Sequence, residues 1–325
     1  MLPLVSIILL TYNQEQYVKD ALQSILDQDY NNLEIIISDD CSLDATPNII
    51  RTFIQEHFSG RNVLFNRNEQ NIGLIGNCNK AIELSHGEYI VLAAGDDISL
   101  SNRVSISVEK ITKLGVDGLA MNFQYINAEG RKLNQYGINR DIETMLYTIN
   151  DYINHVPVTA LGPSKIISRR VFEVFGLLSD NCQTEDTTLT FRALLLNGIA
   201  KINTIGLLYR WHGNNLSAQE SLMMRINPIL IYKQYKRDLR LAYDKKLISS
   251  QQYHRIFRIL LDYKHVQTFI RKRYMTDSVI KKHFIGIIFL LNPFVLSNHK
   301  SRNWLIREFP EVFLIKDKIK CTLNR

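Results

Sequence analysis

The chain has 325 residues but only four cysteines, which stand far apart and form no CxxC pair. This spacing argues against a disulfide framework and a cysteine-based zinc site, and it is typical of a protein from a reducing cytosol. Long hydrophobic runs are lacking as well: the longest late run, residues 284–291, is far shorter than the roughly 18 to 20 residues that a membrane-spanning helix needs. The apolar start has no basic residues and no cleavage site, so we expect a buried strand there and not a signal peptide.

What is present suits a folded protein of about two domains. Hydrophobic residues make up 46% of the chain and charged residues 22%, which is enough to bury a sizeable core. Residues 218–325 hold 22 Lys and Arg against 8 Asp and Glu, whereas residues 1–217 hold 17 against 24. We therefore predict a first domain over 1–217 with room for a site built on carboxylates. The basic region over 218–325 is expected to face a polyanion or an anionic membrane surface.

Strand and helix patterns alternate over the first 120 residues. Buried strands are predicted over 5–10, 33–38, 63–65 and 89–93, with helical spacing between them. This order predicts an α/β fold with an open, mostly parallel sheet and helices on both faces. The middle of the chain mixes short strands with a helix over 184–197, which Thr184 caps and Gly198 follows. From about residue 219 the pattern is mainly helical.

Polar side chains follow the carboxyl end of each predicted strand. They are Thr11 with Tyr12, Asp39 with Asp40, Asn66 with Arg67, and Asp96 with Asp97. In open α/β sheets ligands bind in the crevice beyond those ends. A Rossmann dehydrogenase would carry GxGxxG after the first strand, and a nucleotidyltransferase usually carries a glycine-rich, basic loop there, but neither pattern is present.

Two of these carboxylate pairs are candidate ligand groups. Asp96 and Asp97 have the oxygen ligands that a hard divalent cation prefers, and such a cation would neutralise a diphosphate. Asp39 and Asp40 can accept hydrogen bonds from a uracil ring or from ribose hydroxyls. Either pair can equally be ordinary turn chemistry at a strand end.

Two later segments are also rich in chemical groups. Glu185 and Asp186 stand at a predicted helix start, where a carboxylate can act as general base but is also favoured by the helix dipole. Further on, Arg210 can pair with phosphate, and His212 can bind a metal or a phosphate. A lone histidine is more often structural, so local sequence leaves both alternatives open.

Four stretches that hold these residues, 5–46, 68–97, 183–198 and 208–217, resemble the family 2 inverting glycosyltransferases of the GT-A fold. They occur in the family's order and span two thirds of the chain. The resemblance implies an open mixed sheet that binds a nucleoside-diphosphate sugar, most closely a UDP-sugar. It also implies an Mg²⁺ or Mn²⁺ cofactor and transfer of a hexose to an acceptor hydroxyl with inversion. By analogy the acceptor is a saccharide or a lipid-linked saccharide of bacterial surface polysaccharide synthesis.

The resemblance also implies a role for each position. Asp186 matches the family's catalytic base. The set that matches nucleotide contacts is Thr11, Tyr12, Asp39, Asp40, Arg67 and Asp96. Asp97 matches a metal ligand, Arg210 a diphosphate contact, and His212 a metal or diphosphate contact.

Two positions depart from the family pattern. The first Asp of its DxD-type motif is Ala94 here, so the metal would depend on Asp97 with Asp96. The glycine that usually follows the paired Asp is Cys41, which is expected to change the loop. We expect a cytoplasmic enzyme, peripheral on the inner face of the membrane, without nucleic acid partners. The alternatives are a nucleotidyltransferase and a non-enzymatic module that binds membrane or polyanions through the basic region.

Overall fold

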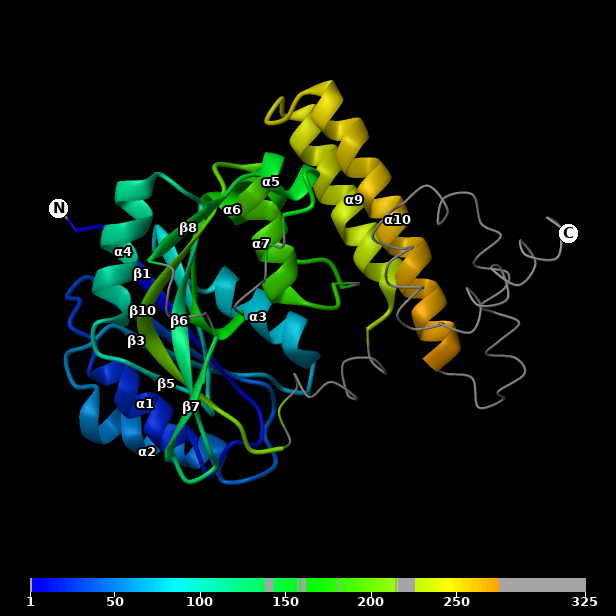
Figure 1. The fold of residues 1–325 in the computed structure, drawn as a ribbon. Helices are drawn as coiled ribbons and strands as arrows, with labels where there is room; N and C mark the ends of the chain where they lie inside the picture. Colours follow the sequence, from blue (N-terminus) through cyan, green and yellow to red (C-terminus); the bar gives the residue numbers. More distant parts are fainter. Residues whose placement is uncertain are drawn as a thin grey trace, which may run out of the picture.

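The protein is described from a computed structural model that covers residues 2–137, 143–156, 162–180, 182–213 and 226–274, with residues 158 and 215. Its centre is a ten-stranded mixed sheet in the order β3-β2-β1-β4-β9-β6-β10-β5, with β7 beside β6 and β8 beside β10 (Figure 1). The strands are β1 (Val5–Thr11), β2 (Leu33–Asp39), β3 (Val63–Arg67), β4 (Tyr89–Ala94), β5 (Ile98–Ser99), β6 (Gly118–Ile126), β7 (Lys132–Tyr136), β8 (Thr144–Tyr147), β9 (Lys165–Ser168) and β10 (Ile199–Arg210).

The longest strands run in one direction. β1 pairs in parallel with both β2 and β4, and β2 pairs in parallel with β3. The short strand β9 is antiparallel to β4 on one side and to β6 on the other, which makes β6 and its parallel neighbour β10 point the same way as β1. The carboxyl ends of these six strands therefore meet at one edge of the sheet, and the prediction of an open mixed sheet is confirmed.

Helices cover both faces of this sheet (Figure 1). The alternation of side chains along β1 explains why: Ile7 and Leu9 belong to one buried cluster, and Ile8 belongs to another. The first cluster is completed by α1 (Val18–Leu26), α2 (Thr46–His57) and α4 (Arg103–Leu114). The second cluster is completed by α3 (Gly73–Glu83), α6 (Arg170–Phe175) and α7 (Glu185–Leu195).

The ends of these helices follow from local sequence. Pro47 stands in the first turn of α2, where its missing N–H costs nothing. Thr184 is the N-cap residue of α7, as predicted, although its side chain bonds Thr187 and not a backbone N–H. Gly198 lies beyond the end of α7 with φ of 98°, and its N–H donates to the carbonyl of Ala193. Asn13 caps no helix, because α1 begins only at Val18.

A helical C-terminal region packs against α7. It consists of α9 (Pro228–Asp244) and α10 (Ser250–Tyr274), and it shares a buried core with α7 and α5 (Ile149–Ile153). Phe191 of α7 stacks on Tyr235 of α9 with ring centroids 4.5 Å apart. At the same interface Arg192 and Asp238 form a fully buried ion pair, with Nε 2.8 Å from Oδ2. No helix over the described ranges is both long and apolar enough to cross a membrane; the apolar run 284–296 and Lys281 and Lys282 lie outside them.

Candidate active site

The sheet topology brings the predicted polar residues to a common edge, which we call the rim: the carboxyl ends of β1, β2, β3, β4, β6 and β10. Thr11, Asp39 and Arg67 lie side by side in register at the ends of the first three strands. The backbone N–H of Asp40 donates to the carbonyl of Thr11 over 2.9 Å. The backbone N–H of Arg210, at the end of β10, donates to Asp97 Oδ1 over 2.9 Å. The rim thus joins residues that are up to about 200 positions apart.

Asp39 organises one part of the rim from a fully buried position. Its Oδ1 accepts hydrogen bonds from Thr11 Oγ1 at 3.0 Å and from Ser42 Oγ at 2.5 Å. Its Oδ2 accepts from the Ser42 N–H at 2.9 Å and lies 3.5 Å from Arg67 Nε. Arg67 in turn donates to the carbonyl of Ser42. Both carboxylate oxygens of Asp39 are therefore occupied by groups that hold the loop after β2.

Asp40 differs from its neighbour. Its Oδ1 accepts hydrogen bonds from Asn68 Nδ2 and from the Ile72 N–H, each at 2.9 Å, and no partner for Oδ2 is found in the described part of the chain. Tyr12, 45% exposed, also belongs to this part of the rim. Cys41 adopts φ of 59°, the left-handed conformation that favours glycine. The substitution of cysteine for the usual glycine therefore keeps a glycine-like backbone in this loop.

A second part of the rim contains Asp96, Asp97 and His212. His212 Nε2 lies 3.1 Å from Asp96 Oδ2, and the imidazole stacks on Tyr17 with ring centroids 5.1 Å apart. Asp97 is buried, and its Oδ2 has no hydrogen-bond partner among the residues that the structure describes. Burial, followed by the negative charge of Asp96, raises the pKa of Asp97 well above its ordinary value.

Glycine is required at Gly95 for close packing in this loop. A Cβ at that position would lie 2.3 Å from Gln14 Oε1 and 2.9 Å from Thr11 Cγ2. These distances are too short for any larger residue without a shift of the first loop. The tight approach holds the segment after β1 against the segment after β4, so the two parts of the rim are in direct contact.

Arg210 uses its whole guanidinium group within the protein. Nε donates to the carbonyl of Asp96 at 2.8 Å, Nη1 to the carbonyl of Ala128 at 2.7 Å, and Nη2 to Asp20 Oδ2 at 3.0 Å. The side chain is only 2% exposed, and its charged carbon lies 4.8 Å from the ring centroid of Tyr17. Arg210 therefore ties the loop after β4 to α1 and to the turn after β6.

Asp186 lies in the first turn of α7 and is half-buried. Its Oδ1 accepts a hydrogen bond from the Thr187 N–H at 2.7 Å, and its carbonyl accepts from Lys165 Nζ at 2.5 Å and from Thr190 Oγ1 at 2.8 Å. A Cβ at Gly162 would lie 3.0 Å from Asp186 Oδ2, so the backbone passes close to this oxygen. The carboxylate is thus held on one side and confined on the other.

Arg103 connects the turn of Asp186 with the strand that leads to Asp96 and Asp97. Its buried guanidinium donates to the carbonyl of Leu92 in β4 at 2.9 Å and to that of Pro163 at 2.7 Å. Pro163 lies in the short helix η1 (Gly162–Ser164), which packs against both β4 and α7. The candidate base is therefore fixed relative to the β4 end of the rim.

Sequence reasoning missed two residues around Asp186, namely Lys165 and Tyr235, and it left the state of Glu185 undetermined. Lys165 is buried at the start of β9, and desolvation lowers the pKa of its ammonium. Tyr235 of α9 hydrogen-bonds the side chain of Thr187, and burial raises the pKa of its phenol well above the ordinary value. Glu185 has a pKa raised to about 7, mainly by burial and then by the charge of Asp186. Only Lys165 could have been noticed from sequence, because it is a charged residue directly before the apolar pair Ile166 and Ile167.

The second part of the rim fits a divalent cation that also binds phosphate. No cluster of three His, Cys, Asp or Glu suitable for a metal occurs among the residues that the structure describes. Asp96 and His212 offer two ligand atoms, and no described residue hydrogen-bonds the buried Oδ2 of Asp97 in the same loop. Mg²⁺ is commonly held by one or two carboxylates together with substrate phosphates, so a cation here would take its remaining ligands from the substrate.

Comparison with known proteins agrees with this architecture. Residues 6–176 match the sequence profile described as Glycosyl transferase family 2, so the chain belongs to that family. The chain is 35% identical over 111 residues to the putative glycosyltransferase EpsE of Bacillus subtilis, a match that covers 34% of this chain and 39% of EpsE.

A longer match joins this chain to WfgD of Escherichia coli, a UDP-Glc:alpha-D-GlcNAc-diphosphoundecaprenol beta-1,3-glucosyltransferase. The two are 26% identical over 200 residues, which cover 62% of this chain and 73% of WfgD. Among solved structures, S. aureus TarS 1–349 in complex with UDP-GlcNAc has a TM-score of 0.59 at 19% identity, covering 88% of this chain and 80% of that chain. This likeness supports the GT-A type of fold.

Proposed function

We propose that the protein transfers a sugar from a nucleoside-diphosphate donor, of the UDP type, to an acceptor hydroxyl. The observation that carries this proposal is the rim, where Asp40 and the Asp96–His212 pair lie at the carboxyl ends of parallel strands and the turn of Asp186 is linked to β4 through η1. Membership of glycosyl transferase family 2 supports the reaction class. WfgD is named for a reaction with UDP-Glc, and this name together with the UDP-GlcNAc complex of TarS supports a uridine nucleotide.

The nucleotide would lie along the first part of the rim. In this assignment the partnerless oxygen of Asp40 accepts from the imide N–H of the base, and Tyr12 walls the base. Thr11, Asp39 and Arg67 support these contacts by holding the loop after β2. Asp96 and His212 would contact the ribose and diphosphate. The guanidinium nitrogens of Arg210 already donate within the protein. Arg210 would therefore affect these contacts only indirectly, by holding the loop that carries Asp96.

Asp186 is assigned as general base. It would take the proton from the acceptor hydroxyl, whose oxygen then attacks the anomeric carbon from the face opposite the diphosphate. A new glycosidic C–O bond forms as the bond to the diphosphate breaks, so a single displacement inverts configuration. Mg²⁺ or Mn²⁺ held by Asp97 and by substrate phosphates, with Asp96 and His212 beside it, would supply charge neutralisation of the departing diphosphate.

We further propose a lipid-linked saccharide as acceptor, in the synthesis of a bacterial surface polysaccharide, at the inner face of the cell membrane. The support is the similarity to WfgD, which is named for an acceptor that carries diphosphoundecaprenol. The test is incubation of the protein with a panel of UDP-sugars, a divalent cation and a GlcNAc-diphosphate lipid, with release of UDP as the signal. A protein that releases no UDP with any donor and acceptor would be a binding module instead.

The variant Asp40→Ala should lose affinity for UDP by about tenfold or more, while its affinity for pyrophosphate stays near that of the wild type. The reason is that a hydrogen bond to a charged group typically contributes about 1.5–3 kcal/mol, and Asp40 is assigned to the base. Competition by UDP and by pyrophosphate against a fluorescent nucleotide measures both affinities.

The matched control for Asp40 is Asp44→Ala. Asp44 accepts from the N–H groups of Glu15 and Thr46 in the same loop, so its loss loosens the loop without removing the proposed base contact. Any effect of Asp44→Ala should fall on both competitors alike. If Asp40→Ala loses affinity for UDP and for pyrophosphate equally, Asp40 contacts the phosphates and not the base.

Mn²⁺ should raise the affinity of the wild type for UDP, and Asp97→Asn should abolish that increase without a large effect on the melting temperature. Asn keeps an oxygen for the Arg210 N–H that Asp97 Oδ1 accepts, so the variant removes the carboxylate and preserves this buried hydrogen bond. Calorimetry of UDP binding with and without Mn²⁺ gives the four affinities, and we expect the increase in the wild type to be about tenfold or more. If the wild type binds UDP with the same affinity with and without Mn²⁺, the metal has no part in nucleotide binding.

A further inference from the structure

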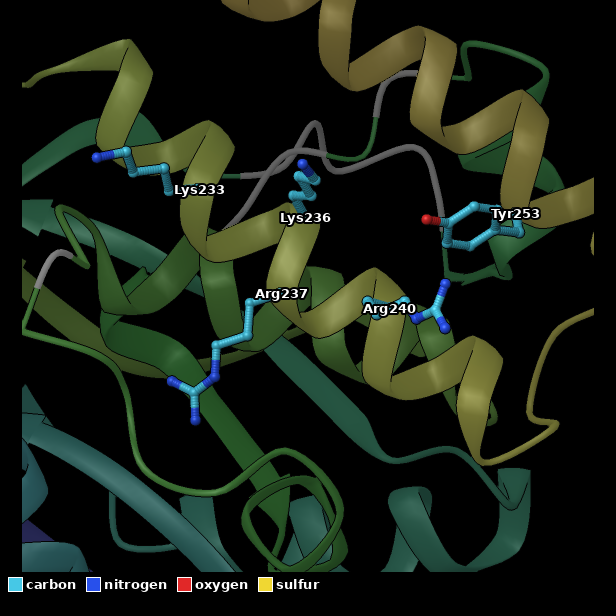
Figure 2. A pocket seen from close by; sticks show the side chains of 5 residues that line it. All are labelled: Lys233, Lys236, Arg237, Arg240 and Tyr253. Carbon is cyan, nitrogen blue, oxygen red and sulfur yellow. The ribbon is translucent and has the colours of Figure 1, made fainter.

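The helix α9 presents a strongly cationic face that the site does not use. Lys233, Lys236, Arg237 and Arg240 are all exposed along it, and they line a hollow of about 420 Å³ together with Tyr253 of α10 (Figure 2). Within the described residues only Arg240 has an acidic partner, Asp244 at 3.0 Å. We call these four cations and Ile229 the α9 face.

The opposite side of α9 explains why this face is free. Ile231, Gln234, Asp238, Leu239 and Ala242 are buried against α7 and its neighbours. Positions 229, 233, 236 and 240 follow one another at steps of four, three and four residues, so they form a single stripe on the other side. The Arg192–Asp238 ion pair and the hydrogen bond from the Ser179 N–H to Gln234 Oε1 fix the rotation of α9 about its axis. The stripe is therefore held away from α7 and beside α10, where Lys236 Nζ lies 5.9 Å from the ring centroid of Phe257.

We propose that the α9 face docks the protein on a membrane surface through anionic phospholipid headgroups. Figure 2 shows the four cations spread along the helix and pointing in different directions, with no common centre between them. Lys233, Lys236 and Arg240 share the stripe and can meet one plane of headgroups together, with Arg237 at its margin, whereas one small anion could contact only some of them. The excess of cations gives the charge complementarity, since residues 226–274 contain twelve Lys and Arg but three Asp and no Glu.

An exposed apolar residue completes the face. Ile229 is 39% exposed in the first turn of α9, on the same stripe as Lys233 and Lys236. Membrane-surface helices combine basic residues with apolar side chains that enter the boundary between headgroups and acyl chains. Docking through α9 requires no membrane span, in keeping with the helices that the structure describes.

Co-sedimentation of the full chain with vesicles tests this proposal. Binding is expected with mixed phosphatidylglycerol–phosphatidylcholine vesicles, not with phosphatidylcholine alone, and it should fall as salt rises. The triple variant Lys233→Gln, Lys236→Gln, Arg237→Gln should lower the partition coefficient on the order of 100-fold. Ile229→Ser should lower it about fivefold and leave the salt dependence unchanged.

The matched control removes the same charge elsewhere, through Lys19→Gln, Lys110→Gln and Lys113→Gln on α1 and α4. This triple should keep most of the binding, since those helices cover the other side of the sheet (Figure 1). An equal loss in both triples, or binding to neutral vesicles, would overturn the proposal. So would a raised KM of the α9 triple for a short-chain acceptor without vesicles, because α9 would then hold the acceptor's diphosphate. UDP release from a water-soluble acceptor tests the catalytic assignment independently.

Discussion

Asp186→Asn is expected to lower the turnover number by about 10²–10⁴-fold while UDP binding stays unchanged, because the carboxylate is needed only to accept a proton. The variant should fold. Asn keeps an oxygen for the Thr187 N–H, and the hydrogen bonds of Lys165 and Thr190 go to the backbone carbonyl. Turnover at saturating donor and calorimetry of UDP binding are the two measurements.

Glu185→Gln is the matched comparison, since it removes the neighbouring carboxyl group from the same turn. The pKa of Glu185, raised to about 7, means that the group is already partly neutral at physiological pH. We expect a smaller loss of turnover from this variant than from Asp186→Asn. The opposite ranking would make Glu185 the base. If Asp186→Asn keeps more than half of the wild-type turnover, Asp186 only stabilises the start of α7 and is not the base.

Arg192→Met is expected to lower the free energy of unfolding by about 3–5 kcal/mol, the usual cost of removing one partner from a buried ion pair. Asp238, fully buried, would lose the guanidinium that contacts both of its oxygens, and the carbonyls of Gly176 and Leu177 would lose a donor. Denaturant unfolding followed by circular dichroism measures the change.

Two further variants identify the cause of that loss. Arg240→Met breaks a solvent-exposed pair with Asp244 on the same helix and should leave the free energy of unfolding almost unchanged. Arg192→Met combined with Asp238→Leu removes both buried charges and should recover part of the stability. If the double variant is no more stable than Arg192→Met alone, packing and not the unpaired charge explains the loss.

The rim could be predicted from sequence because it depends on regular features. Each polar pair follows an apolar run, and parallel strands bring their carboxyl ends together whatever the intervening residues are. The predictions of the mixed sheet, of Thr184 as N-cap and of a mainly helical region from about residue 219 rested on equally local patterns. The structure confirms the first two, and it confirms the third over residues 226–274, the part of that region that it describes.

The different roles of adjacent residues could not be predicted from such local patterns. Asp39 and Asp40 are adjacent and chemically identical, yet one has both oxygens occupied and the other has one free. Arg210 suggests phosphate binding by residue type, but its burial depends on carbonyls of Asp96 and Ala128 from distant parts of the chain. The contact of Tyr235 with the turn of Asp186 likewise depends on how α9 packs, which no local pattern encodes.

The antiparallel strand β9, only four residues long, has a mechanical consequence. It is hydrogen-bonded to β4 on the nucleotide side and to β6 on the other side, so it fastens the two halves of the sheet into one plate. A hinge motion between the two halves would have to break those backbone hydrogen bonds. Adaptation of the site to different donors and acceptors must therefore occur in the loops around the edge of the plate. We expect that exchange of these loops, with the plate kept intact, changes the sugar specificity.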